Sequence, residues 1–204
     1  MKYLTLFALL LFSCNRSKET DKVVVRDSIT EKKAPIPEIP SGYLIEPGVR
    51  IGHIELNSDA EKLESLLGKP DFSDAAMGKA WVSWYGKNTD GGKQQELNVY
   101  TTYENNELMK KVVRLVRVTS SQFQTSHGLR TGDSFEKIQK AFPDIVHLGD
   151  YNASTPEPVL MYDEVQSGIA FEFQNDTCIA ITIHPKGRKV TDDYITLHPD
   201  MKLL

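Results

Sequence analysis

The sequence predicts an α+β fold of two tandem repeats, each a short helix followed by an antiparallel meander, with the helices packed on one face of an antiparallel sheet. Three observations predict it: a recurring helix-start motif, a change of apolar period after each copy, and turn-rich segments between the predicted strands. The chain has 204 residues, 40% of them hydrophobic, which is enough to bury one sizeable core.

Two similar motifs predict the helices. One reads "SDAEKLESLLGKPD" from Ser58 to Asp71, and the other reads "DSFEKIQKAFPD" from Asp133 to Asp144. In both, Ser or Asp is followed three residues later by Glu, which is the spacing of a capping box. Apolar residues then recur at helical spacing. A Gly-Lys-Pro sequence or a single proline ends each helix.

The apolar period changes from near 3.6 to 2 after each predicted helix, which indicates strands. The predicted strands are residues 79–86, 95–103, 108–120, 158–164, 168–174 and 177–185. Apolar residues alternate strictly through Ile169, Phe171 and Phe173. One face of these hairpins is therefore expected to lie on a core. We expect Cys178 to be a buried thiol that faces away from Ile179, Ile181 and Ile183.

Basic residues recur through the predicted strand 108–120, at Lys110, Lys111, Arg114 and Arg117. This pattern is typical of a solvated strand or of an edge strand protected against aggregation. Attraction of an anionic partner is the alternative interpretation.

The composition divides the chain into five segments. We expect a cleaved signal peptide at 1–13, a flexible charged and proline-rich tether at 14–41, the two repeats at 42–120 and 121–186, and a C-terminal tail at 187–204. The tether contains Pro35, Pro37 and Pro40, which favour an extended, semi-rigid spacer. The apolar run "YLTLFALLLF" is much shorter than the roughly 20 residues that span a bilayer as a helix.

The end of that apolar run resembles the lipobox of bacterial lipoproteins. Leu11, Ser13 and Cys14 match the motif, and Phe12 stands where a smaller residue is usual. The resemblance implies cleavage before Cys14, a diacylglycerol on its sulfur and an acyl chain such as palmitate on its amine. The lipid would anchor the chain to a membrane of the bacterial cell envelope. Asn15, the residue after the cysteine, favours the outer membrane under the sorting rule of that family.

The order of elements around Ser58–Asp71 and Asp133–Asp144 resembles two known groups of proteins. These are the β-lactamase-inhibitory proteins, with their tandem-repeat fold, and the small lipoproteins of the outer-membrane-protein assembly machinery. The resemblance covers roughly residues 48–185 and implies binding of another envelope protein through an exposed sheet face or loops. The matched motifs are caps and turns, so no functional residue carries over.

An aromatic cluster in the first meander is the candidate protein-binding site. Its members are Trp81, Trp84, Tyr85, Tyr100 and Tyr103. In a strand, Trp81 and Tyr85 share one face and Trp84 takes the other, so these rings cannot all be core. Exposed rings give large contact area at low entropic cost. Packing beneath the helices is the alternative for each ring.

Signals for catalysis and for cofactors are sparse. The histidines have no metal-binding spacing, so we expect neither a metal nor a cofactor. A net charge of −4 argues against nucleic acid as a partner.

Ser134 and His147 fall in blocks similar to those of one esterase family, which leaves an envelope esterase or hydrolase as the alternative. Our main prediction is a lipid-anchored, non-enzymatic protein-binding or scaffolding module.

Overall fold

The computed structural model describes residues 39–90, 93–104, 107–153, 156–192 and 197–204, with backbone alone at 88–90 and 107–109. The predicted signal peptide and most of the predicted tether lie outside these residues. Among the residues described, no helix is both long enough and apolar enough to span a membrane. The described residues belong to one unit that contains two β-sheets and two short helices.

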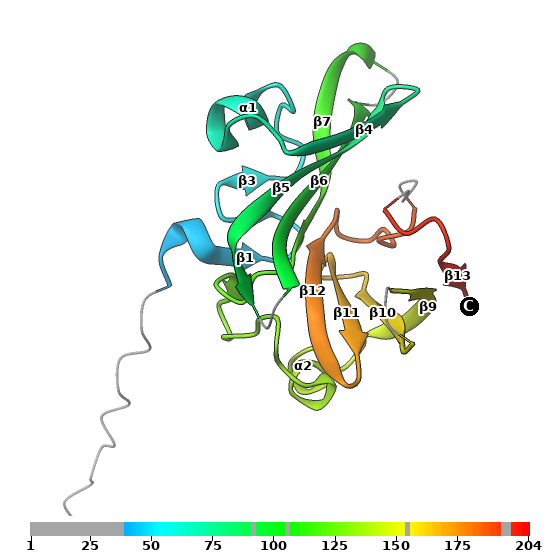
Figure 1. The fold of residues 1–204 in the computed structure, drawn as a ribbon. Helices are drawn as coiled ribbons and strands as arrows, with labels where there is room; N and C mark the ends of the chain where they lie inside the picture. The colour runs from blue at the N-terminus through cyan, green and yellow to red at the C-terminus, as the bar shows by residue number, and fades with distance from the viewer. Residues whose placement is uncertain (1–38, 91–92, 105–106, 154–155, 193–196) are drawn as a thin grey trace, which may run out of the picture. The chain divides into compact units, whose positions relative to one another are not determined.

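A nine-stranded antiparallel sheet forms most of the fold (Figure 1). Its order is β13-β9-β10-β11-β12-β7-β6-β5-β4. The strands are β4 (Phe72–Ala76), β5 (Lys79–Asp90), β6 (Lys93–Glu104), β7 (Glu107–Val118), β9 (Val146–Asn152), β10 (Pro158–Glu164), β11 (Ile169–Gln174), β12 (Thr177–Ile183) and β13 (Lys202–Leu203). Strands β7 and β12 join its two halves through three residue pairs.

A four-stranded sheet of order β3-β2-β1-β8 accompanies the large one. Its strands are β1 (Leu44–Glu46), β2 (Arg50–Ile51), β3 (Ile54–Glu55) and β8 (Gln124–Thr125), preceded by a 3-10 turn at Ser41–Tyr43. Strands β1 and β8 run parallel, whereas β1, β2 and β3 pair antiparallel. The helices are α1 (Lys62–Leu67) and α2 (Phe135–Ala141).

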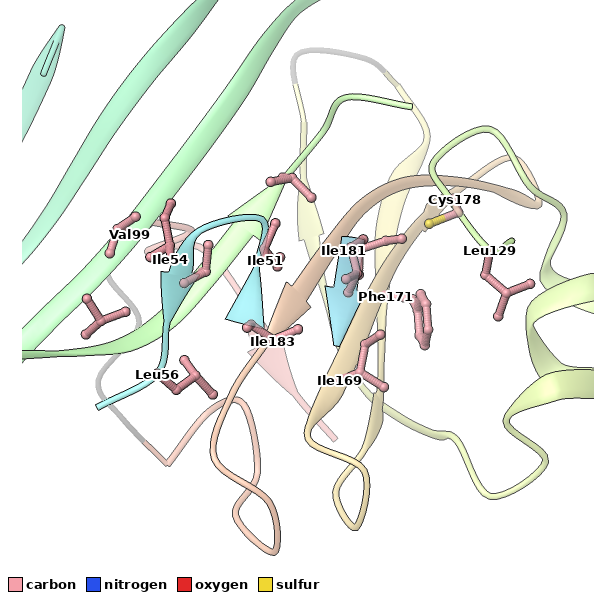
Figure 2. Close-up of a cluster of buried hydrophobic side chains, with 14 of the residues drawn as sticks. Ile51, Ile54, Leu56, Val99, Leu129, Ile169, Phe171, Cys178, Ile181 and Ile183 are labelled. Carbon is pink, nitrogen blue, oxygen red and sulfur yellow. The ribbon is translucent and has the colours of Figure 1, made fainter. Parts of the chain in front are cut away.

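The main core cluster lies between one face of the large sheet and the small sheet (Figure 2). Ile45, Ile51 and Ile54 come from the small sheet, and each helix contributes one fully or nearly buried residue, Leu63 or Ile138. They meet alternate residues of the large sheet, including Val99, Val116, Ile169, Phe171, Ile181 and Ile183. Burial of these side chains removes apolar area from water at about 25 cal/mol per Å².

The opposite face of the large sheet carries a second, smaller cluster. Its buried members are Trp81, Tyr100, Leu115, Leu148, Met161, Ala170 and Val190. Leu197 and Met201, from the C-terminal segment, pack against it. Strand β13 of the same segment pairs with β9, so the end of the chain forms one edge of the sheet.

The predicted α+β class of two helix-then-meander repeats is wrong, because the fold is mostly β. The helices have only 6 and 7 residues, which is less than two turns each. We expected helices to cover one face of the large sheet, but most of that cover comes from the small sheet. Its β-branched isoleucines, Ile45, Ile51 and Ile54, lie in a segment where no strand was predicted. Short helices contribute little burial, and β-branched residues pack well on a pleated surface.

The predicted capping boxes also differ from the observed helix starts. The Ser58 hydroxyl donates to the carbonyl of Glu55 at 2.7 Å instead of capping a helix, and α1 begins only after Glu61. In the second motif the cap is Ser134, whose oxygen accepts from the Lys137 backbone N–H at 3.3 Å.

The prediction that strand 108–120 is a solvated or edge strand is wrong. Strand β7 lies between β6 and β12, and Arg117 is buried. The edges of the large sheet are β4 and β13. Arg117 was expected to face solvent. Instead, it binds the buried carboxylate of Glu172 on β11.

Cys178 is buried as predicted, but it faces the same side as Ile181 and Ile183. A register shift in the β11–β12 pairing inserts an extra residue between them and reverses the expected alternation. Burial, reinforced by the charge of Glu172, raises the pKa of this thiol far above its ordinary value.

Gly168 fixes the small sheet to the large one. It has φ +77°, and its carbonyl accepts from the backbone N–H groups of Gly48 and His184 at 3.0 and 3.1 Å. A Cβ there would overlap the His184 carbonyl oxygen. We expect Gly168→Ala to cost about 1–3 kcal/mol in chemical unfolding. Gly187→Ala, at φ +74° in open space, is the matched control and should cost less. Equal losses would contradict this steric role.

Candidate functional site

The five predicted aromatic residues lie on two faces of the sheet rather than in one patch. Trp81 and Tyr100 are buried in the second core cluster, with ring centroids 5.3 Å apart. Trp84 is half-buried against the main cluster, and its indole N–H donates to the Gly68 carbonyl at 3.0 Å. Tyr85 is exposed, and Tyr103 is half-buried. The structure therefore does not bring these five rings together.

Trp84 and Tyr103 do share a groove, which we name the α1 groove. It is open, has a volume of ≈ 480 Å³ and lies between α1 and the face of β4, β5 and β6. Its residues are Ala60, Glu61, Leu63, Glu64, Pro70, Ser73, Ala75, Ala80, Val82, Trp84, Thr101, Tyr103 and Lys111. The groove combines aromatic and aliphatic walls with three charged side chains, a mixture that suits a peptide better than a purely apolar ligand.

The Tyr103 ring has two close contacts. The Lys111 ammonium lies 5.4 Å from its centroid, within the range of a cation–π contact. The ring also lies against Gly78, where any Cβ would overlap it. Gly78 has φ +80°, so glycine serves both the turn and the ring. These contacts fix an aromatic surface in the groove at little entropic cost.

A second hollow, the hairpin hollow, lies beside the β4–β5 turn. Its volume is ≈ 390 Å³, and its residues are Asp74, Ala76, Met77, Lys79, Ala80, Trp81 and Tyr100. The Trp81 indole N–H is buried and has no hydrogen-bond acceptor within the described part of the chain. A buried donor without an acceptor costs about 1–3 kcal/mol, so a water or a bound group in the hollow would stabilise it.

Strand β4 separates the two hollows. Alternate β4 residues belong to each: Ser73 and Ala75 line the α1 groove, and Asp74 and Ala76 line the hairpin hollow. All five residues of β4 are exposed. The site is thus one sheet edge with a hollow on either face.

Arg117 forms the centre of a buried ionic network on the face of the second cluster. Its Nε and Nη2 donate to the two carboxylate oxygens of Glu172, both at 2.7 Å. Its Nη1 donates to Asn98 Oδ1 at 2.8 Å and lies 3.2 Å from the carboxylate of Glu96. The Tyr151 hydroxyl donates to Glu172 Oε2 at 2.7 Å. This arginine is therefore committed to the interior and does not attract an anionic partner at the surface.

The network shifts the pKa values of its members. Burial alone would raise the pKa of Glu172, but the adjacent Arg117 guanidinium overcomes this and holds that pKa well below 4.5. Burial raises the pKa of Tyr151, and the Glu172 carboxylate raises it further. The pKa of Arg117 lies above its ordinary value because the attraction of Glu172 outweighs burial. All three groups therefore keep one protonation state around neutral pH.

The possible catalytic pair, Ser134 and His147, has separate contacts. Ser134 caps α2, as described above. The His147 Nε2 lies 2.6 Å from Asp150 Oδ1, and its ring stacks on Tyr162 with centroids 4.8 Å apart. The structure gives each side chain its own partners and shows no hydrogen bond that joins the two. Nucleophilic catalysis needs the base within hydrogen-bond reach of the nucleophile.

Two further predictions bear on the site. Cys14, the predicted lipid attachment point, lies outside the described residues. Within the described ranges, no group of three or more His, Cys, Asp or Glu side chains is placed to hold a metal ion.

Sequence reasoning missed β4 and the position of Glu61 and Glu64 beside the groove. The predicted strands do not include Phe72–Ala76, because "FSDAA" is short and has few strand-forming residues. Strand β5 pairs with it over five residues and so defines it as a strand. The exposure of Phe72, which is 51% accessible, is known only from the structure.

Comparisons with known proteins assign no family. No family model matches the sequence, and no curated protein matches it. Among solved structures, the chain is similar to a DUF4309 family protein (YjgB) from Bacillus subtilis subsp. subtilis str. 168. That similarity has 13% identity and a TM-score of 0.39, and it covers 67% of this chain and 84% of the other. It is too weak to assign a fold family or a function.

Proposed function

We propose that this chain is a lipid-anchored protein of the outer membrane of the bacterial envelope, and that its folded part is a non-enzymatic protein-binding module. The signal-like N-terminus with Cys14 supports the anchor. The α1 groove supports the binding role. Its occupant in this proposal is a peptide segment of another envelope protein.

The observation that carries the binding role is the conjunction of Trp84 and Tyr103 in one open groove. The two rings come from neighbouring strands, β5 and β6, which pair antiparallel without a register shift from Ala80 to Tyr85. Aromatic side chains on a rigid sheet are the commonest strong contributors to protein interfaces, because they lose few rotamers on binding. Both were members of the predicted binding set.

Charge on the α1 side indicates which peptides would bind. Glu61 and Glu64 line the groove three positions apart, and the described residues provide neither with an ion-pair partner. Like charges at this spacing on a helix repel each other. A Lys or Arg side chain from a bound peptide would relieve the repulsion. We therefore expect the peptide to be basic where it passes α1.

Peptide display on the full-length protein tests this proposal. Selected peptides should carry Lys or Arg together with an apolar residue. Tyr103→Ala should lower the affinity for a selected peptide by about tenfold, since an aromatic anchor contributes about 1–2 kcal/mol to binding. Fluorescence anisotropy with a labelled peptide provides the affinity.

Tyr85→Ala is the matched control, because Tyr85 is an exposed aromatic on the opposite face of the same strand pair. It should change the affinity by less than about twofold. Circular dichroism would confirm that both variants are folded. Failure to select any peptide, or an equal effect of the two variants, would refute the α1 groove as the binding site.

A further inference from the structure

Strand β4 is an edge strand whose charged protection against pairing is limited to Asp74. It ends the order of the large sheet and pairs only with β5 within the described residues. It contains neither Lys nor Pro, and its pairing with β5 shows no register shift. Most proteins protect an edge with such charges, prolines or bulges, because a bare edge exposes N–H and C=O groups to another strand. The other edge, β13, has only two residues, and one of them is Lys202.

The two hollows give this edge a specific shape. Side chains of a strand point alternately to the two faces of a sheet. A strand added outside β4 would therefore place one set of side chains over the α1 groove and the alternate set over the hairpin hollow. Phe72 and Met77, 51% and 100% accessible, are exposed apolar residues at the two ends of β4.

Charge favours a partner strand over a second copy of this chain. Asp74 lies at the centre of β4, so a symmetric antiparallel pairing centred there would place two aspartates directly opposite each other. Like charges in that position destabilise a strand pair. A basic residue opposite Asp74 would instead form a favourable cross-strand pair. Glu61 and Glu64 add negative charge on the groove side.

We infer that the partner contributes an extended strand, which pairs with β4 and places alternate side chains in the α1 groove and the hairpin hollow, with a basic residue near Asp74 or α1. This inference rests on the proposed function and adds the binding mode to it. Main-chain hydrogen bonds would supply affinity, and the two hollows would supply specificity.

N-methylation of a selected peptide tests the binding mode without altering the protein. Methylation removes one backbone donor at a time. Strand addition predicts that affinity falls by about tenfold at every second residue and little at the residues between, because alternate N–H groups face β4. A uniform response along the peptide would overturn strand addition.

Hydrogen exchange of the full-length protein provides the second readout. With peptide bound, the amides of β4 should exchange at least about tenfold more slowly, and the edge strand β13 should not change. If Tyr103→Ala weakens binding but the β4 amides of the natural chain stay unprotected with peptide bound, strand addition is overturned and the binding module is left intact. The β4 amides could instead be protected from exchange at high protein concentration without peptide, with a dimer seen in sedimentation. That result would overturn pairing with a partner's strand and would favour pairing with a second copy of this chain.

Discussion

Glu172→Gln is expected to lower the free energy of unfolding by about 3–5 kcal/mol. The substitution keeps the size of the side chain but removes the charge that faces Arg117. Both side chains of this pair are almost inaccessible to solvent, at 8% and 2%. A buried guanidinium that loses its carboxylate keeps its desolvation cost and loses the attraction that offset it. Asn98 and Glu96 would remain near Arg117, but Glu96 is partly exposed and its contact is longer.

Urea unfolding followed by tryptophan fluorescence would measure this loss. Glu64→Gln is the matched control, since Glu64 is exposed, and it should change stability by less than about 0.5 kcal/mol. Replacing both partners, as in Arg117→Met with Glu172→Met, should yield a more stable protein than Glu172→Gln alone, because no buried charge remains unpaired. A loss below about 1 kcal/mol for Glu172→Gln would show that the pair contributes little.

The same carboxylate makes stability depend on pH. Its pKa is lower in the folded protein than the ordinary value of 4.5 that it regains on unfolding. The unfolded chain therefore binds a proton at this group first as the pH falls. The stabilisation is fully present above about pH 4.5 and is lost progressively below it. Glu172→Gln should show a weaker decline below that pH than the natural chain, and parallel declines would contradict the assignment.

Cys14→Ser is expected to release most of the protein from membranes. A serine cannot carry the thioether-linked diacylglycerol that the lipobox resemblance implies. Each buried CH₂ contributes about 0.8 kcal/mol to membrane binding, so loss of the acyl chains removes the anchor. Cell fractionation with an antibody to the folded part would measure the fraction in the membrane pellet. Labelling with an alkyne fatty acid would show whether the chain is acylated.

Cys178→Ala is the control for that experiment, because it removes the other cysteine and leaves the predicted attachment point. It should fractionate and label as the natural chain does. If Cys14→Ser stays in the membrane fraction and still labels with the fatty acid, the predicted lipid attachment is wrong.

Local features of the fold could be read from the sequence. Each predicted strand overlaps an observed one, since alternation of apolar residues is a property of a few neighbouring positions. Both short helices were expected near their observed places, and Cys178 was expected in the core. Class and topology could not be read in this way. The balance between helix and sheet depended on β1–β3, which are only two or three residues long and exist because other strands pair with them.

The binding site shows the same division. The prediction that the aromatic residues cannot all be core is confirmed, since Tyr85 is exposed, but their grouping was not predicted. Trp84 and Tyr103 share a groove because β5 and β6 pair in one register and α1 lies beside them. Arg117 was read as a surface charge because its partner Glu172 is distant in the sequence and meets it only in the folded sheet.

By itself, the sequence determined the places of strands β5, β6, β7, β10, β11 and β12, and it provides the signal that predicts a lipid anchor at Cys14. Both depend on short runs of residues. Only the tertiary structure decided which strand lies at the edge, which charges are buried and which rings line a common groove. Those properties depend on strand order and on contacts between distant residues. The edge strand β4 has little local signal in the sequence, and it becomes a candidate binding surface only because β5 pairs with one side of it.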